Sequence, residues 1–289
     1  MVDTVTRAPV PGALVTPSWD LPAVTAGPDG TYELGAVPFP PTGPYDLTIS
    51  ADGFVTRTVW LNWQPGARSG VTLDVIRDAP PFSMQFYNEM VRGTFDQEEA
   101  PWPIRRLPSA PAFYVQTVDQ NGRAIEPEVL AVVRDAIQRA VPAYSGGRLS
   151  AAIESGAETR PPQDGWVVVT FVRNPEDDET CGLAYIGRLA GEITLHNDIC
   201  SCGSVKVPGS LVMHEVGHAL GFFHVDDIDS VMYPIIPRRC PPGEPSDAEL
   251  YHAAIAYSRP RSNTQPDDDP SEGAFSTATD AIRGVRVRN

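Results

Sequence analysis

The sequence predicts two folded domains in series, a small all-β domain followed by an α+β domain. Up to about residue 77, short runs of alternating apolar residues are separated by turns. From residue 112 onward, helical and strand patterns follow one another. A length of 289 residues suits two domains, and 42% hydrophobic with 20% charged residues is typical of globular chains. We expect domains at 1–77 and 112–258, a proline-rich linker at 78–111 and a disordered tail at 259–289.

The charge balance excludes several classes of partner. The chain has 22 Lys and Arg residues against 37 Asp and Glu residues, which gives a formal net charge of −15. A chain this acidic is not expected to bind nucleic acid or an anionic membrane through bulk charge. No run reaches the roughly 18 apolar residues that a membrane-spanning helix requires, so no membrane insertion is expected.

The amino-terminal strands alternate with a period of two. In YDLTISADGFVTRTVWL, Tyr45, Leu47 and Ile49 alternate before a turn at Asp52 and Gly53, and a second strand follows. A third strand is expected at 71–75. Together with APVPGALV and DGTYEL earlier in the chain, this region resembles the carboxypeptidase regulatory-like, or prealbumin-like, β-sandwich. The resemblance implies a fold and no chemistry; a spacer role is favoured, with a surface ligand as the alternative.

The second domain is predicted to contain one clear amphipathic helix and a buried strand. In EPEVLAVVRDAIQRAVPAY, Pro127 suits the first helical position, and one apolar stripe contains Leu130, Val133, Ile137 and Val141. The continuous apolar run GWVVVTFV at 165–172 indicates a buried strand. Further strands are expected at FYVQTVD, LAYIGRL and EITLHNDI, and one short helix within FSMQFYNEMVRGTF of the linker.

Two more helices are predicted toward the end of this domain. Pro208 opens a helix over GSLVMHEVGHALG that ends at Gly221. The last helix, SDAELYHAAIAYS, has Ser246 followed three residues later by Glu249, which is a capping-box pattern.

The segment HEVGHALGFFH carries the chemistry. On a helix, His214 and His218 lie one turn apart on the same face, so both imidazoles can reach one zinc ion. Glu215 is then placed to take a proton from a metal-bound water. Gly221 permits a sharp turn that brings His224 back as a third ligand. Three protein ligands leave a fourth tetrahedral position for water, which is the pattern of a catalytic zinc site.

The motif HExxHxxGxxH, followed by DSVMYP, resembles the metzincin metallopeptidases and, in the order of its Met turn, the matrixins. Tyr233 directly follows the methionine, and in matrixins this tyrosine is not a metal ligand. The resemblance covers roughly residues 112–258 and implies an α+β metzincin-type domain. It implies Met232 in the turn beneath the metal, Glu215 as general base, and zinc ligands His214, His218 and His224.

The resemblance also implies the reaction and how the substrate binds. The expected function is a zinc-dependent endopeptidase, with protein or peptide as substrate and one catalytic zinc ion. An extended substrate is expected to add as a strand to a sheet edge, formed by EITLHNDI or the adjoining LAYIGRL. Two alternatives remain: a surface binding or adhesion protein with an inert metallopeptidase-like domain, and a zinc amidase.

The cysteines suggest the compartment. Cys200 and Cys202 are too close to bridge each other without strain, so each is expected to pair with either Cys181 or Cys240. A four-cysteine zinc site is the alternative. No secretory signal is recognisable at 1–16, so the expected location, secreted or at the cell surface, rests on the cysteines and the resemblance.

Smaller signals concern additional metals. A second, structural zinc ion is not expected because only His196 and His252 remain as further histidines. The acidic runs PEDDE at 175–179 and VDDID at 225–229 could bind Ca²⁺, although neither has a complete calcium-loop pattern. The aspartates of the second run could instead cap the Met turn or orient a ligand histidine.

Overall fold

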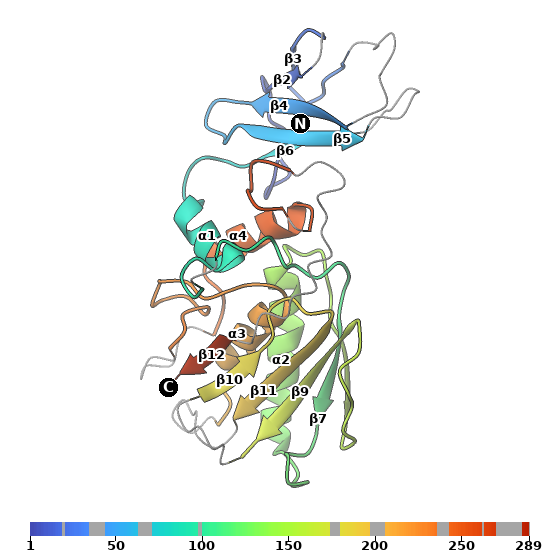
Figure 1. The fold of residues 1–289 in the computed structure, drawn as a ribbon, viewed down its shortest axis with the longest axis vertical. Helices are drawn as coiled ribbons and strands as arrows, with labels where there is room; N and C mark the ends of the chain where they lie inside the picture. Colours follow the sequence, from blue (N-terminus) through green and yellow to red (C-terminus); the bar gives the residue numbers. More distant parts are fainter. Residues whose placement is uncertain are drawn as a thin grey trace. The chain divides into compact units, whose positions relative to one another are not determined.

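The chain folds into two compact units, which are described separately. The first unit is formed by Met1–Ser83 with Ser258–Ala278, and the second by Met84–Tyr257 with Thr279–Asn289 (Figure 1). The computed structural model describes residues 1–18, 21–34, 44–62, 71–97, 100–173, 180–196, 206–235, 243–261, 263–269 and 285–288.

The first unit is all-β in its described residues. Its strands are β1 (Val2–Asp3), β2 (Leu14–Pro17), β3 (Val24–Thr25), β4 (Pro44–Ser50), β5 (Arg57–Asn62) and β6 (Asp74–Val75). They form a four-stranded antiparallel sheet in the order β3-β2-β4-β5 and a two-stranded parallel sheet of β1 and β6.

Alternation explains how this unit builds its core. Val15 on β2 faces Ile49 on β4, and Leu47 lies two residues earlier on the same strand; all three are fully buried. The predicted turn at Asp52 and Gly53 connects β4 to β5. The structure thus confirms the predicted β4–β5 hairpin, while the likeness to a carboxypeptidase regulatory-like sandwich stays a prediction.

The segment after helix α4 belongs to this unit. The backbone N–H of Thr58 donates to the Asp267 carbonyl at 2.8 Å, and the Asp269 N–H donates to the Thr58 carbonyl at 3.1 Å. The side chains of Arg259 and Asn263 are fully buried. The prediction of a disordered tail is therefore wrong for residues 259–261 and 263–269. The polar composition of this segment suggested disorder, but its polar side chains are buried against charged partners.

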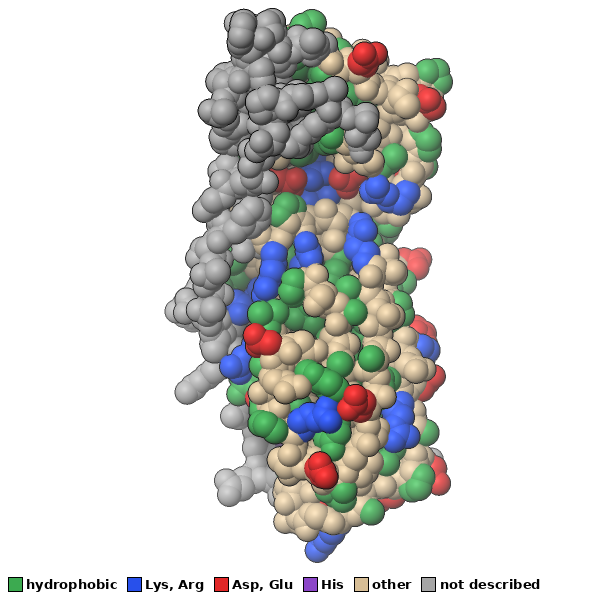
Figure 2. All heavy atoms as spheres, turned by 90° about the vertical axis from the view of Figure 1, so that its right-hand side faces the viewer, with side chains coloured by type: hydrophobic (Ala, Val, Ile, Leu, Met, Phe, Trp, Pro, Cys, Tyr) green, Lys and Arg blue, Asp and Glu red, His purple; other side chains and the backbone are tan. Residues whose placement is uncertain are grey.

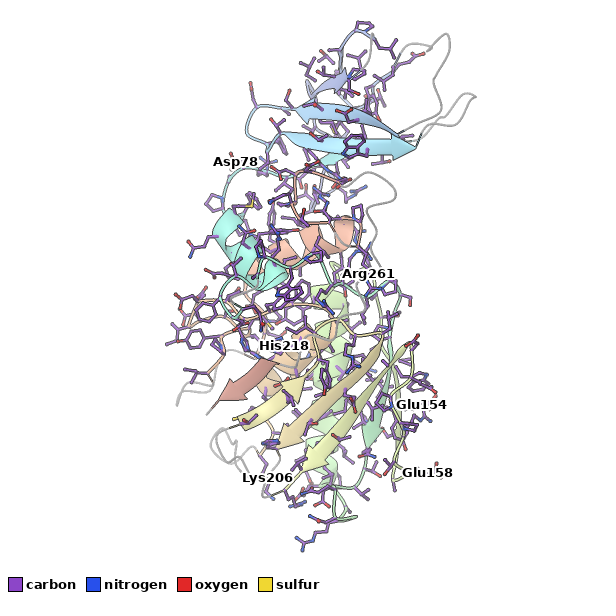
Figure 3. The ribbon with its side chains drawn as sticks, in the orientation of Figure 1. Asp78, Glu154, Glu158, Lys206, His218 and Arg261 are labelled. Carbon is purple, nitrogen blue, oxygen red and sulfur yellow. The ribbon has the colours of Figure 1, made fainter. Side chains whose placement is uncertain are left out.

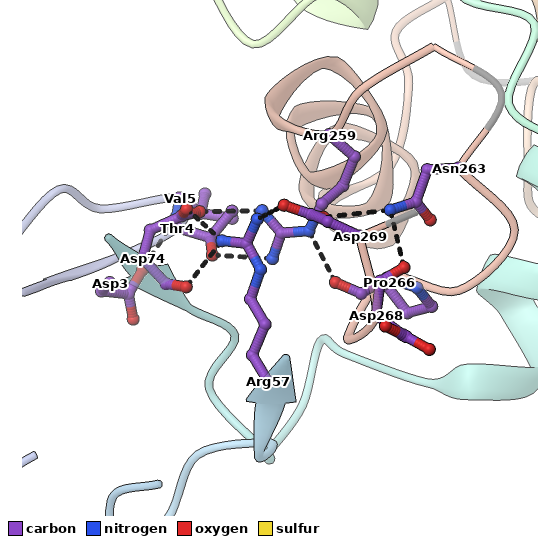
Figure 4. Close-up of polar contacts among 10 residues, drawn as sticks. All are labelled: Asp3, Thr4, Val5, Arg57, Asp74, Arg259, Asn263, Pro266, Asp268 and Asp269. Carbon is purple, nitrogen blue, oxygen red and sulfur yellow. Dashed lines mark hydrogen bonds and ion pairs between the residues drawn. The ribbon is translucent and has the colours of Figure 1, made fainter. Parts of the chain in front are cut away.

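Those partners form a buried ionic network (Figure 4). Arg57 pairs with Asp74, and its Nη2 lies 2.6 Å from Asp269 Oδ2. Arg259 Nη1 lies 2.9 Å from Asp74 Oδ2, and its Nε donates to the Pro266 carbonyl at 2.6 Å. Two arginines thus face two aspartates, so the network is electrically balanced.

The second unit combines a mixed sheet with four helices among its described residues. The helices are α1 (Met84–Arg92), α2 (Pro127–Tyr144), α3 (Gly209–Ala219) and α4 (Asp247–Ser258). The strands are β7 (Ala112–Gln116), β8 (Ala152–Gly156), β9 (Trp166–Val172), β10 (Thr180–Ala184), β11 (Ala190–His196) and β12 (Val285–Arg288). Their order is β12-β10-β11-β9-β7-β8, and Figure 1 shows β12, β10, β11, β9 and β7 side by side.

The direction of the strands changes within this sheet. Strands β8, β7, β9 and β11 run parallel to one another, whereas β10 is antiparallel to both β11 and β12. The segment EITLHNDI, one of two candidates for a sheet edge, contributes its described residues to β11, which is an interior strand. The edge of the sheet on this side is strand β12, which lies beyond β10.

The sequence-predicted helices are confirmed. The stripe on α2 is buried at all four predicted positions, and helices α2 and α3 pack against each other. Ser246 and Glu249 form the expected capping box: the Ser246 N–H donates to Glu249 Oε2 at 2.7 Å, and the Glu249 N–H donates to Ser246 Oγ at 3.2 Å. The short strand β8 was not predicted, because its sequence AIESG has little apolar alternation.

The proline-rich segment is not merely a linker. Helix α1, expected within FSMQFYNEMVRGTF, forms and belongs to the second unit together with the chain that follows it. The Phe223 N–H donates to the Met90 carbonyl at 2.7 Å, and the backbone of Arg105 lies against Gly221. The boundaries 78–111 and 112–258 therefore differ from the compact units, because α1 and the chain that follows it make their contacts within the second unit.

The surface is mixed in charge. On the face in Figure 2, acidic and basic side chains of the described residues are interspersed rather than gathered into one large patch. No helix within the described part of the chain has the length and apolarity needed to cross a membrane.

Candidate metal centre

Three histidine side chains converge in the second unit. His214 and His218 come from successive turns of α3, and His224 comes from the loop that follows it. The Nε2 atom of His224 lies 3.1 Å from that of His214 and 3.2 Å from that of His218. All three rings are buried, and Figure 3 shows His218 within the unit's interior.

The loop that returns His224 depends on Gly221. This glycine has φ of +110°, a conformation that residues with a Cβ rarely adopt, and a Cβ here would also collide with the backbone of Arg105. The sequence placed a sharp turn at this glycine, and the structure confirms it. The turn reverses the chain, so that a residue six positions after His218 reaches the same point.

The hydrogen bonds of the three rings define which nitrogen carries the proton. His214 Nδ1 lies 2.6 Å from the Val231 carbonyl, and His218 Nδ1 lies 2.8 Å from the Phe222 carbonyl. His224 Nδ1 lies 2.9 Å from a carboxylate oxygen of Asp96. Because these oxygens only accept hydrogen bonds, each Nδ1 donates its proton. In the neutral rings the three Nε2 lone pairs then point toward one another.

This arrangement fits a tetrahedral zinc ion. Zinc–nitrogen bonds of 2.0–2.1 Å at tetrahedral angles place ligand nitrogens about 3.3–3.4 Å apart. The two measured Nε2 separations are close to that value. Within the described part of the chain, His214, His218 and His224 form the group of potential metal ligands whose ligand atoms lie close together. Converging lone pairs repel one another unless a cation lies between them.

The protein environment keeps the imidazoles of His214 and His218 neutral. Burial, together with the neighbouring histidines, lowers the pKa of His214 well below its usual range. Burial and the nearby His224 lower the pKa of His218 to about 3. Neutral imidazole is the form that binds a metal, so both side chains are ready to act as ligands over the whole physiological pH range.

The described residues offer no hydrogen bond that would offset the burial of the Glu215 carboxylate. Its side chain is fully buried, and neither carboxylate oxygen has a hydrogen-bond partner among the described residues. Burial raises its pKa well above the usual value. It packs against Gly182 of β10, where a Cβ would collide with the carboxylate. A carboxylate in this condition is costly to fold and is typical of groups kept for chemistry.

The Met turn lies directly beneath the histidines. Met232 is fully buried, and its sulfur lies so close to Gly217 of α3 that a Cβ there would collide with it. The preceding residue, Val231, provides the carbonyl that accepts the proton of His214 Nδ1. Tyr233 is half-buried, and no described contact connects it to the three histidines.

Glu249 anchors this turn, a role that the sequence did not indicate. Its carboxylate accepts the backbone N–H groups of Val231 at 3.3 Å and Met232 at 3.1 Å, besides that of Ser246. The Tyr144 hydroxyl also donates to it, at 3.3 Å. Burial raises the pKa of Glu249. The capping-box pattern revealed Glu249, but not that the same carboxylate also holds the turn next to His214.

Asp96 is the second residue that the sequence did not reveal. Its Oδ1 accepts the proton of His224 Nδ1, and its Oδ2 accepts the His224 backbone N–H, both at 2.9 Å. Burial opposes its ionisation, but these bonds to His224 lower the pKa of Asp96. Asp96 lies 128 positions before its partner, in the segment interpreted as a linker. No local pattern could have connected the two.

The aspartates of the run at 225–229, which the sequence suggested for orienting a ligand histidine, lie away from the histidine cluster. Of the run VDDID, Asp227 caps the Met-turn loop: its Oδ1 accepts the Asp229 N–H at 3.1 Å, and its carbonyl accepts the Ser230 N–H. This confirms the capping alternative for Asp227. The orienting carboxylate of the histidine site is Asp96 instead.

The remaining sequence candidates lie apart from the cluster or outside the described residues. His196 ends β11, and His252 on α4 donates from Nδ1 to the Ala248 carbonyl at 2.7 Å. Cys181 is buried and is not a free thiol. The other cysteines and the acidic run at 175–179 lie outside the described residues, so the disulfide pairing and a calcium site stay predictions.

A family model agrees with this geometry. Residues 206–246, which contain all three histidines and the Met turn, match the family model named Matrixin. The chain is also similar to the crystal structure of archaemetzincin from Methanopyrus kandleri, with 14% identity and a TM-score of 0.37, over 52% of this chain and 97% of that one. The comparison with curated proteins gives no match.

The predicted resemblance to the matrixins is thus confirmed over residues 206–246. The family match and the three-histidine cluster together support a zinc-dependent metallopeptidase, which is a hydrolase. This conclusion concerns the second unit alone, because the match lies entirely within it.

Proposed function

We propose that the second unit is a zinc endopeptidase in which His214, His218 and His224 bind the metal and Glu215 is the general base. The observation that carries the proposal is the convergence of three Nε2 lone pairs beside a buried carboxylate without a hydrogen-bond partner. When bound, zinc supplies a Lewis acid and lowers the pKa of a water molecule toward about 7.

The residues of the chain then have distinct tasks. A Glu215 oxygen accepts a proton from the attacking water and passes it to the nitrogen of the leaving amine. A raised pKa suits this exchange, because the carboxylate must gain and lose a proton near neutral pH. Met232 and the Met-turn backbone hold His214 in position, and we assign Tyr233 no role in metal binding.

The substrate is proposed to be an extended segment of protein or peptide. The family match favours peptide-bond hydrolysis over the alternatives of an inert binding domain or an amidase. Burial of the whole histidine cluster also argues for chemistry in a protected site. Export to the cell surface or beyond is part of this proposal and rests on the cysteines.

Cleavage of a mixed peptide library tests the proposal. The zinc-loaded protein is compared with its Glu215→Ala variant, and the zinc content of both is measured. Cleavage by the natural protein that disappears in a variant still holding one zinc ion supports the assignment. If both proteins bind zinc and neither cuts, the endopeptidase proposal is wrong, and assays with cell-wall amides then distinguish an amidase from a binding protein.

A further inference from the structure

The outer edge of β10 is occupied by another part of the same chain. Strand β12 pairs antiparallel with β10, with Val285 opposite Ala184, Arg286 opposite Leu183 and Val287 opposite Gly182. The two strands lie side by side in Figure 1. Without β12, β10 would present a row of unpaired backbone groups that could accept a different strand.

This edge borders the proposed catalytic site. Gly182 contacts the Glu215 carboxylate, and the residue opposite Gly182 across the ladder is Val287. Neighbouring strands lie about 4.8 Å apart, so the backbone of β12 lies one strand spacing from the part of β10 that touches Glu215. Any extended segment that pairs with β10 here is carried past the site.

The register has an irregularity at the same place. Between Thr180 and Gly182 the pairing with β12 shifts, so Cys181 is passed over and Thr180 lies opposite Arg288. Such a bulge bends a strand and redirects its neighbours. The end of β12 nearest Arg288 is therefore held less regularly than the three pairs before it, and β12 is a short strand with few ladder bonds.

We propose that β12 occupies in cis the edge of β10 on which an extended substrate would pair, which makes β12 an intramolecular competitor of the substrate. The inference rests on the proposed endopeptidase function. Both β12 and an extended peptide would use the same backbone N–H and C=O groups of β10, so they cannot bind together. The occupant is weak enough to be displaced because it pairs over only four residues.

The expected size of the effect follows from the tether. A covalently attached segment has a local concentration on the order of millimolar. If the free segment binds with a dissociation constant of about 0.1 mM, the tether reduces the apparent affinity for substrate about tenfold. The maximal rate does not change, since saturating substrate displaces β12.

Two variants of the full chain test the proposal, both loaded with zinc. One ends at residue 284, and the other carries Arg286→Pro with Val287→Pro, so that whichever N–H faces β10 is lost. For both we expect a KM about tenfold lower with kcat unchanged. A matched control, Arg286→Gln with Arg288→Gln, removes charge and keeps the strand. If the control lowers KM equally, attraction of charge rather than strand pairing is responsible, and the proposal is wrong.

A binding measurement separates this proposal from the proposed function. A fluorescein-labelled peptide GVRVRN, with the sequence of residues 284–289, is titrated by fluorescence polarisation into Glu215→Ala protein with and without β12. We expect binding to the truncated form at least tenfold tighter than to the full chain, and none for the peptide GVPPRN. Equal binding to both forms would refute the cis occupant even if cleavage occurs. Tighter binding without any cleavage would uphold it while the endopeptidase proposal fails.

Hydrogen exchange covers the case in which a variant does not fold. In the full chain, amides within Thr180–Ala184 that face β12 should exchange slowly, and added GVRVRN should leave them unchanged. Fast exchange of the β10 amides that face β12, with the amides that face β11 still protected, would show that the outer edge of β10 is free in the natural protein, which contradicts the proposal.

Discussion

The first unit buries two arginines against two aspartates, whereas the second buries three histidines and a glutamate beside which the described residues place no opposite charge. In the first unit, Arg57 and Arg259 share Asp74 between them, and Asp269 completes the network. In the second, the imidazoles face one another, and the oxygens of Glu215 have no hydrogen-bond partner among the described residues.

This difference distinguishes a structural cluster from a functional one. Buried charges that neutralise each other connect distant segments, here the β-strands and the chain after α4. Buried groups whose lone pairs converge and whose carboxylate lacks a partner are folded at a cost that the described residues of the second unit do not offset. Removing one carboxylate from each cluster should therefore have opposite consequences for stability and activity.

The largest effect is expected from Glu215→Gln. The amide has almost the same shape but cannot accept a proton, so kcat for peptide cleavage should fall about 10³-fold. Stability of the second unit should fall by less than about 1 kcal/mol, because a buried carboxylate without a partner is replaced by a neutral group. Peptide cleavage and denaturant unfolding of the same samples measure both quantities. A loss of activity accompanied by loss of zinc would instead show that the substitution disturbs the metal site.

Asp74→Asn should have the opposite effect. Two buried arginines would lose their shared carboxylate, and breaking such a network costs about 3 kcal/mol. The change is expected in the first unit alone, with peptide cleavage unaffected. Hydrogen exchange of amides in β4 and β5 reports on this unit separately, and the exposed Asp52→Asn is the matched control, with an expected change below about 0.5 kcal/mol. Equal exchange in the two variants would show that the network does not stabilise the unit.

The sequence predicted the residues of the site more completely than the boundaries of the two units. The histidines, Glu215, Gly221 and Met232 follow one another within 19 residues, so helical periodicity and one turn suffice to bring them together. Their spatial convergence was predictable because it depends on local geometry alone.

What the sequence could not show depends on long-range contacts. Asp96 reaches His224 across 128 positions, and Arg259 reaches Asp74 across 185. Proline content suggested a linker around Asp96, and polarity suggested disorder after Arg259, because composition does not reveal whether a polar side chain finds a buried partner. The same limit applies to β12, whose pairing with β10 joins segments about a hundred residues apart.

Asp96 sharpens the comparison, because among the described residues its carboxylate is the one that bonds to a histidine of the cluster. Replacing it by Asn should lower zinc affinity 10–100-fold, since the bond that orients His224 and increases its basicity is weakened. Competition with a chelator measures the affinity, and the absorption bands of the cobalt-substituted protein report the ligand geometry. The control is Asp229→Asn, which removes the same charge from an exposed position after His224. Unchanged affinity and spectrum in Asp96→Asn would contradict a positioning role.

Acid should lower the free energy of unfolding of the first unit by a smaller amount than the Asp74→Asn substitution does. Burial opposes ionisation of Asp74, but Arg259 and Arg57 hold the pKa of its carboxyl well below its usual value of 3.8. A carboxyl whose folded-state pKa is depressed binds its proton more readily in the unfolded chain, so its contribution is complete above about pH 5 and declines as the pH falls through 3.8. By pH 3 the loss from this one group should be about 1 kcal/mol. Hydrogen exchange of β4 and β5 at pH 3 and pH 6, corrected for intrinsic rates, measures it, and Asp74→Asn should lack this component. An identical pH dependence in the variant and the natural protein would mean that other carboxylates govern the acid response of the first unit.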